Sequence, residues 1–322
     1  MYVLQVIING ILLGGVYAVL GLGMSLSLGI VKLTNLAHGE YIILGAYASM
    51  LLQAWLGIDP FLSLVISVPF LFFAGYLIQI FLVNRAMMSG SEPALLVTFG
   101  ISVILKDAML LVFGADARHI ATDYSNITVD IAGLSIPLLN ILLLLLSGVA
   151  ILLLHLFMHK TYTGRAIRAV SDDREAASLS GISVGHTLAV ACGIAAATAA
   201  VAGLCVGMKW TWYPSSGGHY LLIAFVIVVI GGLGNVAGTF IAGIVFGLMQ
   251  VIGGASYGLL ISYIFLIVIL TLHPHEALIR FLDRMKSTDR QKTANGLSGS
   301  GFVTVKTQTE FKSEQKESSD AT

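Results

Sequence analysis

Residues 220–253, YLLIAFVIVVIGGLGNVAGTFIAGIVFGLMQVIG, form one apolar stretch that is too long for a single membrane crossing. A straight helix of this length would extend ~51 Å, whereas the hydrocarbon core of a bilayer is ~30 Å thick. Four glycines interrupt the stretch: Gly231, Gly232, Gly234 and Gly238. We therefore predict that it folds back, either as two short crossings or as a re-entrant hairpin. Irregular backbone at that depth must be buried in protein or line a cavity.

The charged segments on either side of this stretch lead to the same prediction. The loop 160–186 carries Lys160, Arg165, Arg168 and Arg174, and eight of the 17 Lys and Arg residues follow residue 275. Short segments rich in Lys and Arg stay in the cytoplasm, so an even number of crossings must separate these two. The apolar runs 187–208 and 257–273 supply two crossings, and 220–253 must therefore return to the side from which it enters.

The composition predicts an integral membrane protein. The chain of 322 residues is 57% hydrophobic and 11% charged, whereas soluble domains carry about 25% charged residues. Its formal net charge of zero argues against a nucleic acid partner. Eight apolar runs are long enough to cross the hydrocarbon core or most of it: 2–31, 41–57, 60–83, 94–114, 137–158, 187–208, 220–253 and 257–273. The predicted fold is an all-α polytopic membrane protein with about eight transmembrane helices plus a re-entrant or broken element.

The loops complete the predicted organisation of the chain. Residues 1–275 form the transmembrane domain, with the polar loop 115–136 and the N-terminus outside and the loop 84–92 inside. The N-terminal segment lacks a basic flank and a cleavage site, so we expect a retained first helix rather than a signal peptide. Residues 276–286, read as a helix, have apolar side chains on one face and charged side chains on the other, which predicts an interfacial amphipathic helix. Residues 287–322 are rich in Ser, Thr, Lys and Glu and are predicted to be a disordered cytoplasmic tail.

Sequence patterns that carry catalytic chemistry are absent. The chain has no phosphate-binding GxxxxGK[ST], HExxH, CxxC or GxSxG pattern. Cys192 and Cys205 would lie ~20 Å apart on one helix, so they cannot bond to each other, and no zinc-ligand spacing surrounds them. We therefore predict no enzyme activity, no metal site and no cofactor bound by this chain.

Glycine and alanine dominate the remaining features. Glycine pairs at four-residue spacing allow close helix packing, which we favour over a hinge role; they are Gly10 with Gly14, Gly203 with Gly207, Gly234 with Gly238, and Gly243 with Gly247. The loop 160–186 predicts a helix over Gly164–Leu179 that ends at the helix-stopping Gly181. Its alanines among strong charges indicate a helix that lies against another protein surface. A solvated connecting loop is the alternative.

Four stretches together resemble one known family. They are NLAHGEYIILGAY (35–47), EPALLVTFGIS (92–102), GRAIRAVSDDREAASLSGIS (164–183) and GGLGNVAGTFIAGIVFG (231–247). The chain is similar over about 1–275 to the permease subunits of bacterial ABC importers for branched-chain amino acids, the LivH-type family. The segment after about residue 287 departs from the usual family pattern.

The resemblance implies partners for this chain. A separate cytoplasmic ATPase would bind ATP and Mg²⁺, and a short helix in the loop 160–186 would dock into a groove on it. Carried over by position, the coupling residues are Gly164, Arg165, Ala166, Arg168, Asp172, Ala176, Ala177 and Gly181. The resemblance also implies a transmembrane dimer with a homologous permease or with a second copy. A solute-binding protein outside the bacterial inner membrane would deliver the substrate.

The polar residues Asn35, His38 and Glu40 lie between two apolar runs and have two interpretations. In the first they are structural: Asn35 and His38 cap helix ends, and a neighbouring helix holds Glu40, with Lys32 as a candidate partner. In the second they line the translocation path or gate, because ionisable groups in a membrane usually face an interior cavity or path.

Residues of the fourth apolar run bear on the same question. Thr98 and Ser102 are further candidates for the path, although small polar residues also serve helix packing. Lys106 and Asp107 are expected to form an ion pair, either in the interior or near the interface.

Branched-chain or other apolar amino acids are the expected cargo of such an importer. Urea or short amides are the alternative within the family. A self-sufficient, ion-coupled secondary transporter is the alternative outside it, because broken helices and membrane carboxylates also occur in that class.

Overall fold

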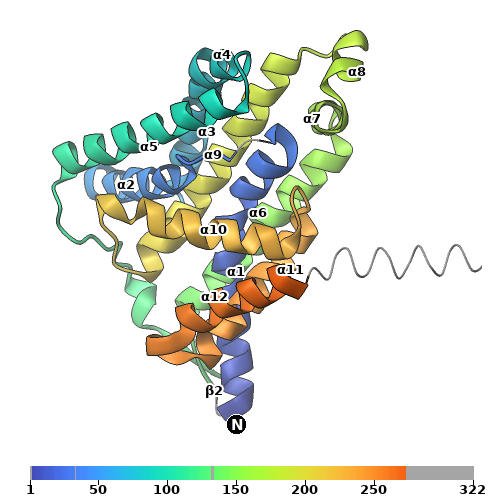
Figure 1. The fold of residues 1–322 in the computed structure, drawn as a ribbon. Helices are drawn as coiled ribbons and strands as arrows, with labels where there is room; N and C mark the ends of the chain where they lie inside the picture. Colours follow the sequence, from blue (N-terminus) through green and yellow to red (C-terminus); the bar gives the residue numbers. More distant parts are fainter. Residues whose placement is uncertain (1, 33, 132–133, 273–322) are drawn as a thin grey trace, which may run out of the picture. The chain divides into compact units, whose positions relative to one another are not determined.

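The computed structural model describes residues 2–32, 34–131 and 134–272. Its helices are α1 Tyr2–Leu26, α2 His38–Leu56, α3 Leu64–Ile78, α4 Asn84–Met87, α5 Ser91–Phe113, α6 Leu138–Lys160, α7 Tyr162–Asp172, α8 Arg174–Leu179, α9 Val184–Lys209, α10 Gly217–Gly231, α11 Val236–Ile252 and α12 Gly254–Leu272 (Figure 1). The π-helical turns η1 Ser27–Val31 and η2 Gln79–Val83 extend α1 and α3, and η3 Asp123–Asn126 and η4 Pro214–Ser216 are 3₁₀ turns. Residues 1–266 form one compact unit, to which the following description applies. The predicted interfacial helix 276–286 and tail 287–322 lie outside the described residues.

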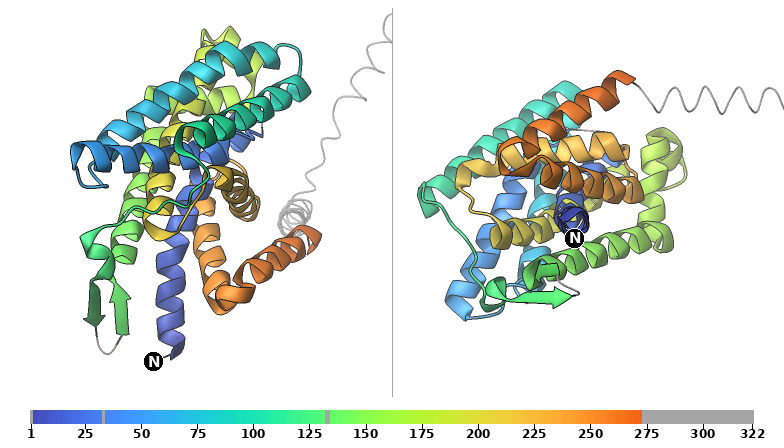
Figure 2. Two further views of the ribbon diagram at one scale, coloured as in Figure 1. Left: turned by 90° about the vertical axis from the view of Figure 1, so that its left-hand side faces the viewer. Right: turned by 90° about the horizontal axis from the view of Figure 1, so that it is seen from below.

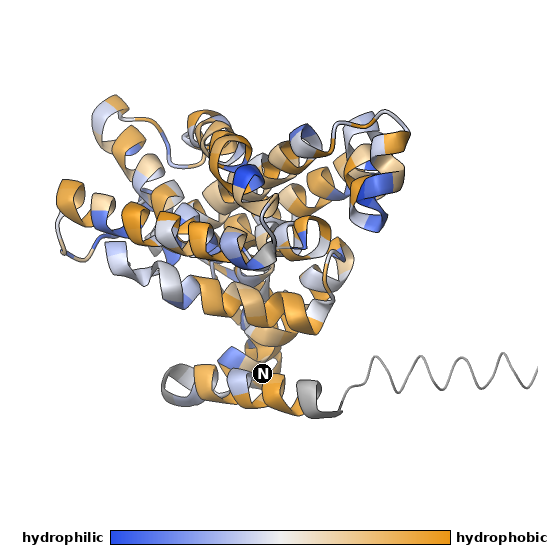
Figure 3. Cartoon of the chain, turned by 45° about the horizontal axis from the view of Figure 1, so that its top comes forward, coloured by the Kyte–Doolittle hydropathy of each residue, from blue (hydrophilic) through white to orange (hydrophobic). Residues whose placement is uncertain are grey.

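Hydrophobic residues dominate the long helices, which are largely orange in the hydropathy colouring of Figure 3. Within the described ranges, six helices are long and apolar enough to cross a membrane: Val3–Val31, Leu64–Met87, Glu92–Phe113, Leu138–Lys160, Val184–Lys209 and Pro214–Gly231. Helix α11 and the segment Tyr257–Val268 are shorter apolar helices. Helix α2, which has His38 and Glu40 in its first turn, is not among the six. The chain is therefore a multi-pass membrane protein, and a count of about eight crossings would also require some of α2, α11 and α12 to cross.

A small β-hairpin departs from the predicted all-α fold. Strands β1 Thr128–Ile131 and β2 Leu134–Pro137 pair antiparallel within and just after the segment expected to be a polar loop. The hairpin lies beside the start of α1, where Gln5 Nε2 donates to the Ser135 carbonyl oxygen at 2.9 Å (Figure 2). At the other end of α1, the Ser171 hydroxyl of α7 donates to the Gly29 carbonyl oxygen at 3.0 Å. The hairpin and the loop 160–186 thus lie at opposite ends of α1. Which end faces the cytoplasm stays a prediction.

The apolar stretch 220–253 does fold back. Helices α10 and α11 pack against each other on either side of the turn 232–235. Gly232 and Gly234 have φ of 89° and 76°, a region that favours glycine. A Cβ on Gly231 would lie 2.6 Å from the Gly238 carbonyl carbon, so the two helices meet where neither residue has a side chain. The Asn235 side chain then caps α11 by accepting from Gly238 N at 3.0 Å.

Helix α9 is the centre of the core and packs against α1, α2 and α3. Nearly half of its residues are Ala or Gly, and small residues allow neighbouring backbones to approach closely. A Cβ on Gly203 would lie 2.2 Å from the Ile42 carbonyl oxygen of α2. Cys192 and Cys205 are both buried in α9 as free thiols, in agreement with the predicted absence of a disulfide between them.

Helices α1 and α11 interlock through glycines over most of their length. A Cβ on Gly14 would lie 2.5 Å from the Ile244 Cα, and one on Gly243 would lie 2.5 Å from the Ala18 Cα. One on Gly247 would lie 2.4 Å from the Gly14 backbone nitrogen. The interpretation of these glycine pairs as sites of tight packing is confirmed for α1 and α11.

Replacing Gly247 with Ala should therefore destabilise the protein by about 1–3 kcal/mol, because a methyl group has no space beside the α1 backbone. The matched control is Gly148→Ala on α6, where nothing lies within 4 Å of the added Cβ. That change should be neutral or should stabilise the helix by up to about 1 kcal/mol. Thermal unfolding of the two variants in detergent measures the difference, and equal stability of the two would contradict the packing described.

Candidate functional site

The first turn of α2 begins inside the protein, directly after a tight connection from α1. Lys32 ends η1 in a left-handed conformation with φ of 54°. The Asn35 side-chain oxygen accepts from Ala37 N at 3.0 Å, and its backbone carbonyl accepts from His38 N at 3.2 Å. Asn35 thus supports the turn that starts α2, as the structural interpretation of this residue expects.

His38 is fully enclosed between α1 and α9. Its Nε2 lies 3.3 Å from the Leu20 carbonyl oxygen, a distance at which a protonated Nε2 donates to that oxygen. A Cβ on Gly23 would lie 2.6 Å from His38 Cε1, so the glycine makes room for the ring. Within the described residues, Nδ1 has no hydrogen-bond partner. His38 therefore connects α2 to the α1 backbone through Nε2, while its Nδ1 atom is buried without a hydrogen-bond partner.

Glu40 lies two residues further along α2 and is 4% exposed. Its carboxylate interacts with the Ser102 hydroxyl and with the charge of Lys106, both on α5. Within the described residues, the Oε2 atom has no hydrogen-bond partner. A Cβ on Gly217, at the start of α10, would lie 2.7 Å from Oε1. Glu40 is thus a buried acid at the meeting point of α2, α5 and α10.

The predicted partner of Glu40 was wrong. Lys32 makes no ion pair within the described part of the chain, where the two ion pairs are Lys106 with Asp107 at 3.7 Å and Arg118 with Asp116 at 3.9 Å. The positive charge near Glu40 comes instead from Lys106, which is far away in the sequence. The expected pairing of Lys106 with Asp107 is confirmed, but both side chains are substantially exposed, at 41% and 57%.

Thr98 and Ser102 lie one turn apart on α5 and face the connection to α2. Thr98 is buried, and its hydroxyl lies 3.4 Å from Leu36 N and donates to the Leu95 carbonyl oxygen at 2.8 Å. Asn35 and Thr98 also border a cavity of about 10 Å³, which is close to the least volume that holds one water molecule. The structure thus brings four of the five predicted path residues together where α5 meets α2 and the turn before it, Asn35 beside Thr98 and Glu40 beside Ser102. The fifth, His38, lies instead between α1 and α9.

The predicted helix Gly164–Leu179 is two helices in the structure. Asp173 breaks it with φ of −148° and ψ of 113°. Its side chain caps α8 by accepting from Glu175 N at 2.8 Å and Ala176 N at 3.1 Å. Gly181 follows α8 with φ of 81°, as expected of a helix-stopping glycine. The expectation of one continuous helix was therefore wrong, and α7 and α8 can change direction at Asp173.

Both short helices are tied to the end of α1. Besides the Ser171 bond to Gly29, Arg174 Nη2 donates to the Val31 carbonyl oxygen at 2.5 Å. These carbonyls lie in the π-helical last turn of α1, where backbone oxygens need partners outside the helix. Gly29 and Ser171 also border a groove of about 290 Å³ that separates α7 from the α10–α11 turn. Movement of α7 and α8 would thus pull on α1 and, through residues 32–37, on the first turn of α2.

The predicted coupling residues divide into an inner and an outer set. Gly164, Ala166 and Ala177 are buried against the rest of the protein, and Arg168 is half-buried. The Arg168 Nη1 lies 3.2 Å from His159 Nδ1 of α6. Arg165, Asp172, Ala176 and Gly181 are exposed. The buried small residues therefore pack α7 and α8 against the rest of the chain. The exposed residues lie on the solvent-accessible side of the two helices.

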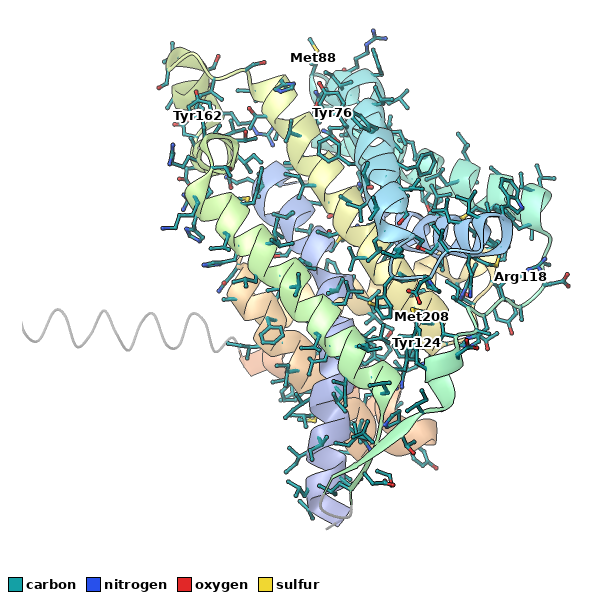
Figure 4. All side chains as sticks on the ribbon, turned by 180° about the vertical axis from the view of Figure 1, so that it is seen from behind. Tyr76, Met88, Arg118, Tyr124, Tyr162 and Met208 are labelled. Atoms are coloured by element: carbon teal, nitrogen blue, oxygen red, sulfur yellow. The ribbon has the colours of Figure 1, made fainter. Side chains whose placement is uncertain are left out.

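Sequence reasoning did not single out the largest exposed apolar side chains of this segment. Leu179, the last residue of α8, is 91% exposed, and Tyr162, the first residue of α7, is 73% exposed and labelled in Figure 4. Ser171 and Arg174, which bond to α1, were also missed. A large apolar residue two positions before a helix-stopping glycine, among small and charged neighbours, is a signal that could have identified Leu179.

Comparison with known proteins identifies the family. Residues 6–272 match the family model described as branched-chain amino acid transport system / permease component. The chain is 30% identical to the high-affinity branched-chain amino acid transport system permease protein LivH of Escherichia coli (strain K12), over 85% of this chain and 94% of the relative. It is 28% identical to the permease protein BraD of Pseudomonas aeruginosa, over 84% of this chain and 94% of the relative.

A more distant relative carries a different name. The autoinducer 2 import system permease protein LsrD of Photorhabdus temperata is 30% identical over 52% of this chain and 54% of the relative. No solved structure matches the chain. The match over nearly the whole described length shows that the chain belongs to the family of branched-chain amino acid transport system permease components.

Proposed function

We propose that this chain is the transmembrane subunit of an ATP-driven importer that moves branched-chain or other apolar amino acids across the bacterial inner membrane. The family match supports the class of transporter and the cargo. The observation that carries the mechanism is the attachment of α7 and α8 to the carbonyls of Gly29 and Val31. A subunit that is driven by a separate motor requires a solvent-exposed element that is bonded to a membrane helix.

In this proposal the motor is a cytoplasmic ATPase that binds ATP and Mg²⁺ and docks on α7 and α8. Arg165, Asp172 and Leu179 are the exposed residues that the ATPase would contact, the charges fixing orientation and the leucine burying apolar surface. Closure of two ATPases would displace α7 and α8 and pull η1. Because η1 leads within six residues to α2, the displacement reaches His38 and Glu40.

The translocation path would run along the contact of α2 with α5. The cavity of about 10 Å³ beside Asn35 and Thr98 is too small for an amino acid, so this conformation is closed there. Opening would separate α2 from α5 and expose the Glu40 carboxylate, which then meets the ammonium group of the zwitterionic substrate. A solute-binding protein outside would select the cargo, since the path itself need not discriminate.

The exposed face of α5 supports pairing with a second permease. Lys106 is seven residues from the end of α5, ~10 Å along the helix axis. Charged side chains that face lipid at such depth cost several kcal/mol, about 2.5–3.5 by insertion experiments. Ile104, Asp107 and Leu111 are all exposed at helical spacing on this face. A homologous permease, or a second copy, would cover it and place Lys106 and Asp107 beside the path.

Cysteine cross-linking in membranes tests this pairing. Ile104→Cys and Leu111→Cys should each give a disulfide or bis-maleimide adduct with a second permease, because 68% and 87% of these side chains are exposed. Phe73→Cys on α3, at 60% exposure, is the matched control and should give none. The native Cys192 and Cys205 are buried and should not react. Adducts in Phe73→Cys, together with none in the two α5 variants, would refute the assignment of the α5 face as the permease interface.

Uptake into vesicles containing the complete transporter tests the function itself. Labelled leucine should enter only with the binding protein and ATP present, and vanadate should stop it. Uptake driven by an ion gradient without the ATPases would instead establish a secondary transporter. Uptake of urea or acetamide in preference to leucine would establish the other cargo of the family.

A further inference from the structure

A wide apolar groove lies on the membrane-facing side of α9, away from the α2–α5 contact. It has a volume of about 680 Å³ and lies between α3 and α6, with α9 as its floor. Figure 4 shows α9 between α6 and α3, and both helices contact α9. Since the floor includes Ala197 and Thr198, small side chains leave the space between the two walls unfilled.

The walls of the groove are apolar along its length and polar at one end only. Leu64 and Val68 of α3 face Val149 and Leu153 of α6 across the space. Lys160, the last residue of α6, and Thr161 lie at the end nearest α7. Lys160 is exposed and forms no ion pair within the described part of the chain. The groove thus combines a long apolar channel with a single unpaired cation at its mouth.

We propose that this groove binds an anionic phospholipid, with an acyl chain between α3 and α6 and the phosphate on Lys160. The lining extends along α6 from Leu146 to Lys160, ~21 Å at 1.5 Å per residue. One leaflet contributes ~15 Å of hydrocarbon, so an acyl chain anchored at Lys160 would remain inside the groove over its whole length. A free phosphate ion would contact only the mouth and would leave the apolar walls uncovered.

A transmembrane helix of another subunit would fill this space less well than an acyl chain. Dividing the volume by the length gives a mean cross-section of ~32 Å², so a helix ~10 Å in diameter, with a cross-section of ~80 Å², would enter the groove only in part. The dimensions and the charge therefore favour a lipid as the occupant.

The position of the headgroup gives the lipid a role in coupling. Thr161 caps α7 by accepting from Gly164 N at 2.9 Å, and its hydroxyl donates to the Phe157 carbonyl oxygen at 2.8 Å. A phosphate on Lys160 would therefore contact the joint between α6 and α7. This consequence for transport rests on the proposed function, whereas the binding of the lipid does not.

Native mass spectrometry of the full chain in detergent tests the site with added phosphatidylglycerol and phosphatidylcholine as probes. The wild type should retain one lipid and prefer phosphatidylglycerol about fivefold, the factor that one lysine worth ~1 kcal/mol provides. Lys160→Gln should abolish the preference, and Lys160→Arg should keep it. Arg85→Gln, a matched loss of an exposed cation outside the groove, should change nothing.

A second pair of variants tests the apolar part. Ala197→Phe fills the floor and should lower retention of both lipids at least about fivefold, whereas Ala54→Phe on the exposed face of α2 should not. A photo-reactive residue in place of Leu153, which is 62% exposed, should cross-link to phospholipid in cell membranes. Cross-links to a protein at that position, unchanged retention in Ala197→Phe, or an unchanged preference in Lys160→Gln would each overturn the proposal. These readouts do not involve transport, so a wrong assignment of function would leave them unaffected.

Discussion

Replacing Leu179 with Asp should reduce ATP-driven uptake by about tenfold or more while the protein remains folded in the membrane. Leu179 is 91% exposed and makes no packing contact that its loss would disturb. An apolar side chain buried at the centre of an interface contributes about 2 kcal/mol when it is a hot spot, and a charge in its place adds a desolvation cost. Co-purification of the ATPase and uptake into vesicles measure the effect.

The matched control is Met88→Asp, which makes the same change of chemistry at another site. Met88 is 88% exposed, and Figure 4 shows it at the same end of the protein as Tyr162. Because it lies outside α7 and α8, its replacement should leave uptake within about twofold of the wild type. Equal losses in the two variants would show that α8 has no special role in docking.

Two features of the fold could be predicted because they depend on the thickness of the bilayer and on the rise per residue of a helix. The run 220–253 had to fold back, since its length exceeds the bilayer thickness and its glycines allow a turn; Gly232 and Gly234 do form the turn. The ends of the long helices also follow the limits of the apolar runs. The β-hairpin was missed although its two strands alternate polar and apolar residues, because a short polar segment between crossings was interpreted as a loop.

The candidate site was harder to predict because its partners come from distant segments. The sequence indicated Glu40 but offered only the nearby Lys32 as its partner, whereas the positive charge that acts on the carboxylate is that of Lys106 on α5, which forms no direct ion pair with it. The break at Asp173 depends on an aspartate that acts as an N-cap. Asp is favoured at N-caps but also occurs within helices, and the neighbouring Asp172 does lie in one, so only the extended backbone shows which role each takes. The bonds from Ser171 and Arg174 to α1 span more than 140 residues and leave no local pattern.

The second large effect is expected at Glu40, where Gln should lower uptake by about tenfold or more without lowering stability. A buried carboxylate with an unpartnered oxygen costs desolvation energy, so the uncharged amide of the same shape should leave the free energy of unfolding equal or higher. Transport should fall because the amide cannot attract the ammonium group of the substrate or the Lys106 ammonium. Uptake rates and unfolding midpoints of the purified complex measure the two quantities separately.

The two interpretations of this residue predict different results for the same variant. If Glu40 acts only by holding α2 to α5 and α10, Glu40→Gln loses stability by more than ~1 kcal/mol and transport falls only as far as the folded fraction does. If it lines the path, Glu40→Asp keeps part of the uptake because the charge remains, while Glu40→Gln loses it at unchanged stability. Asp59→Asn, at an exposed acid three residues after α2, is the control. The amide keeps an oxygen that accepts from Phe61 N, so this variant should match the wild type in both measurements. Wild-type uptake in Glu40→Gln would remove the carboxylate from the path altogether.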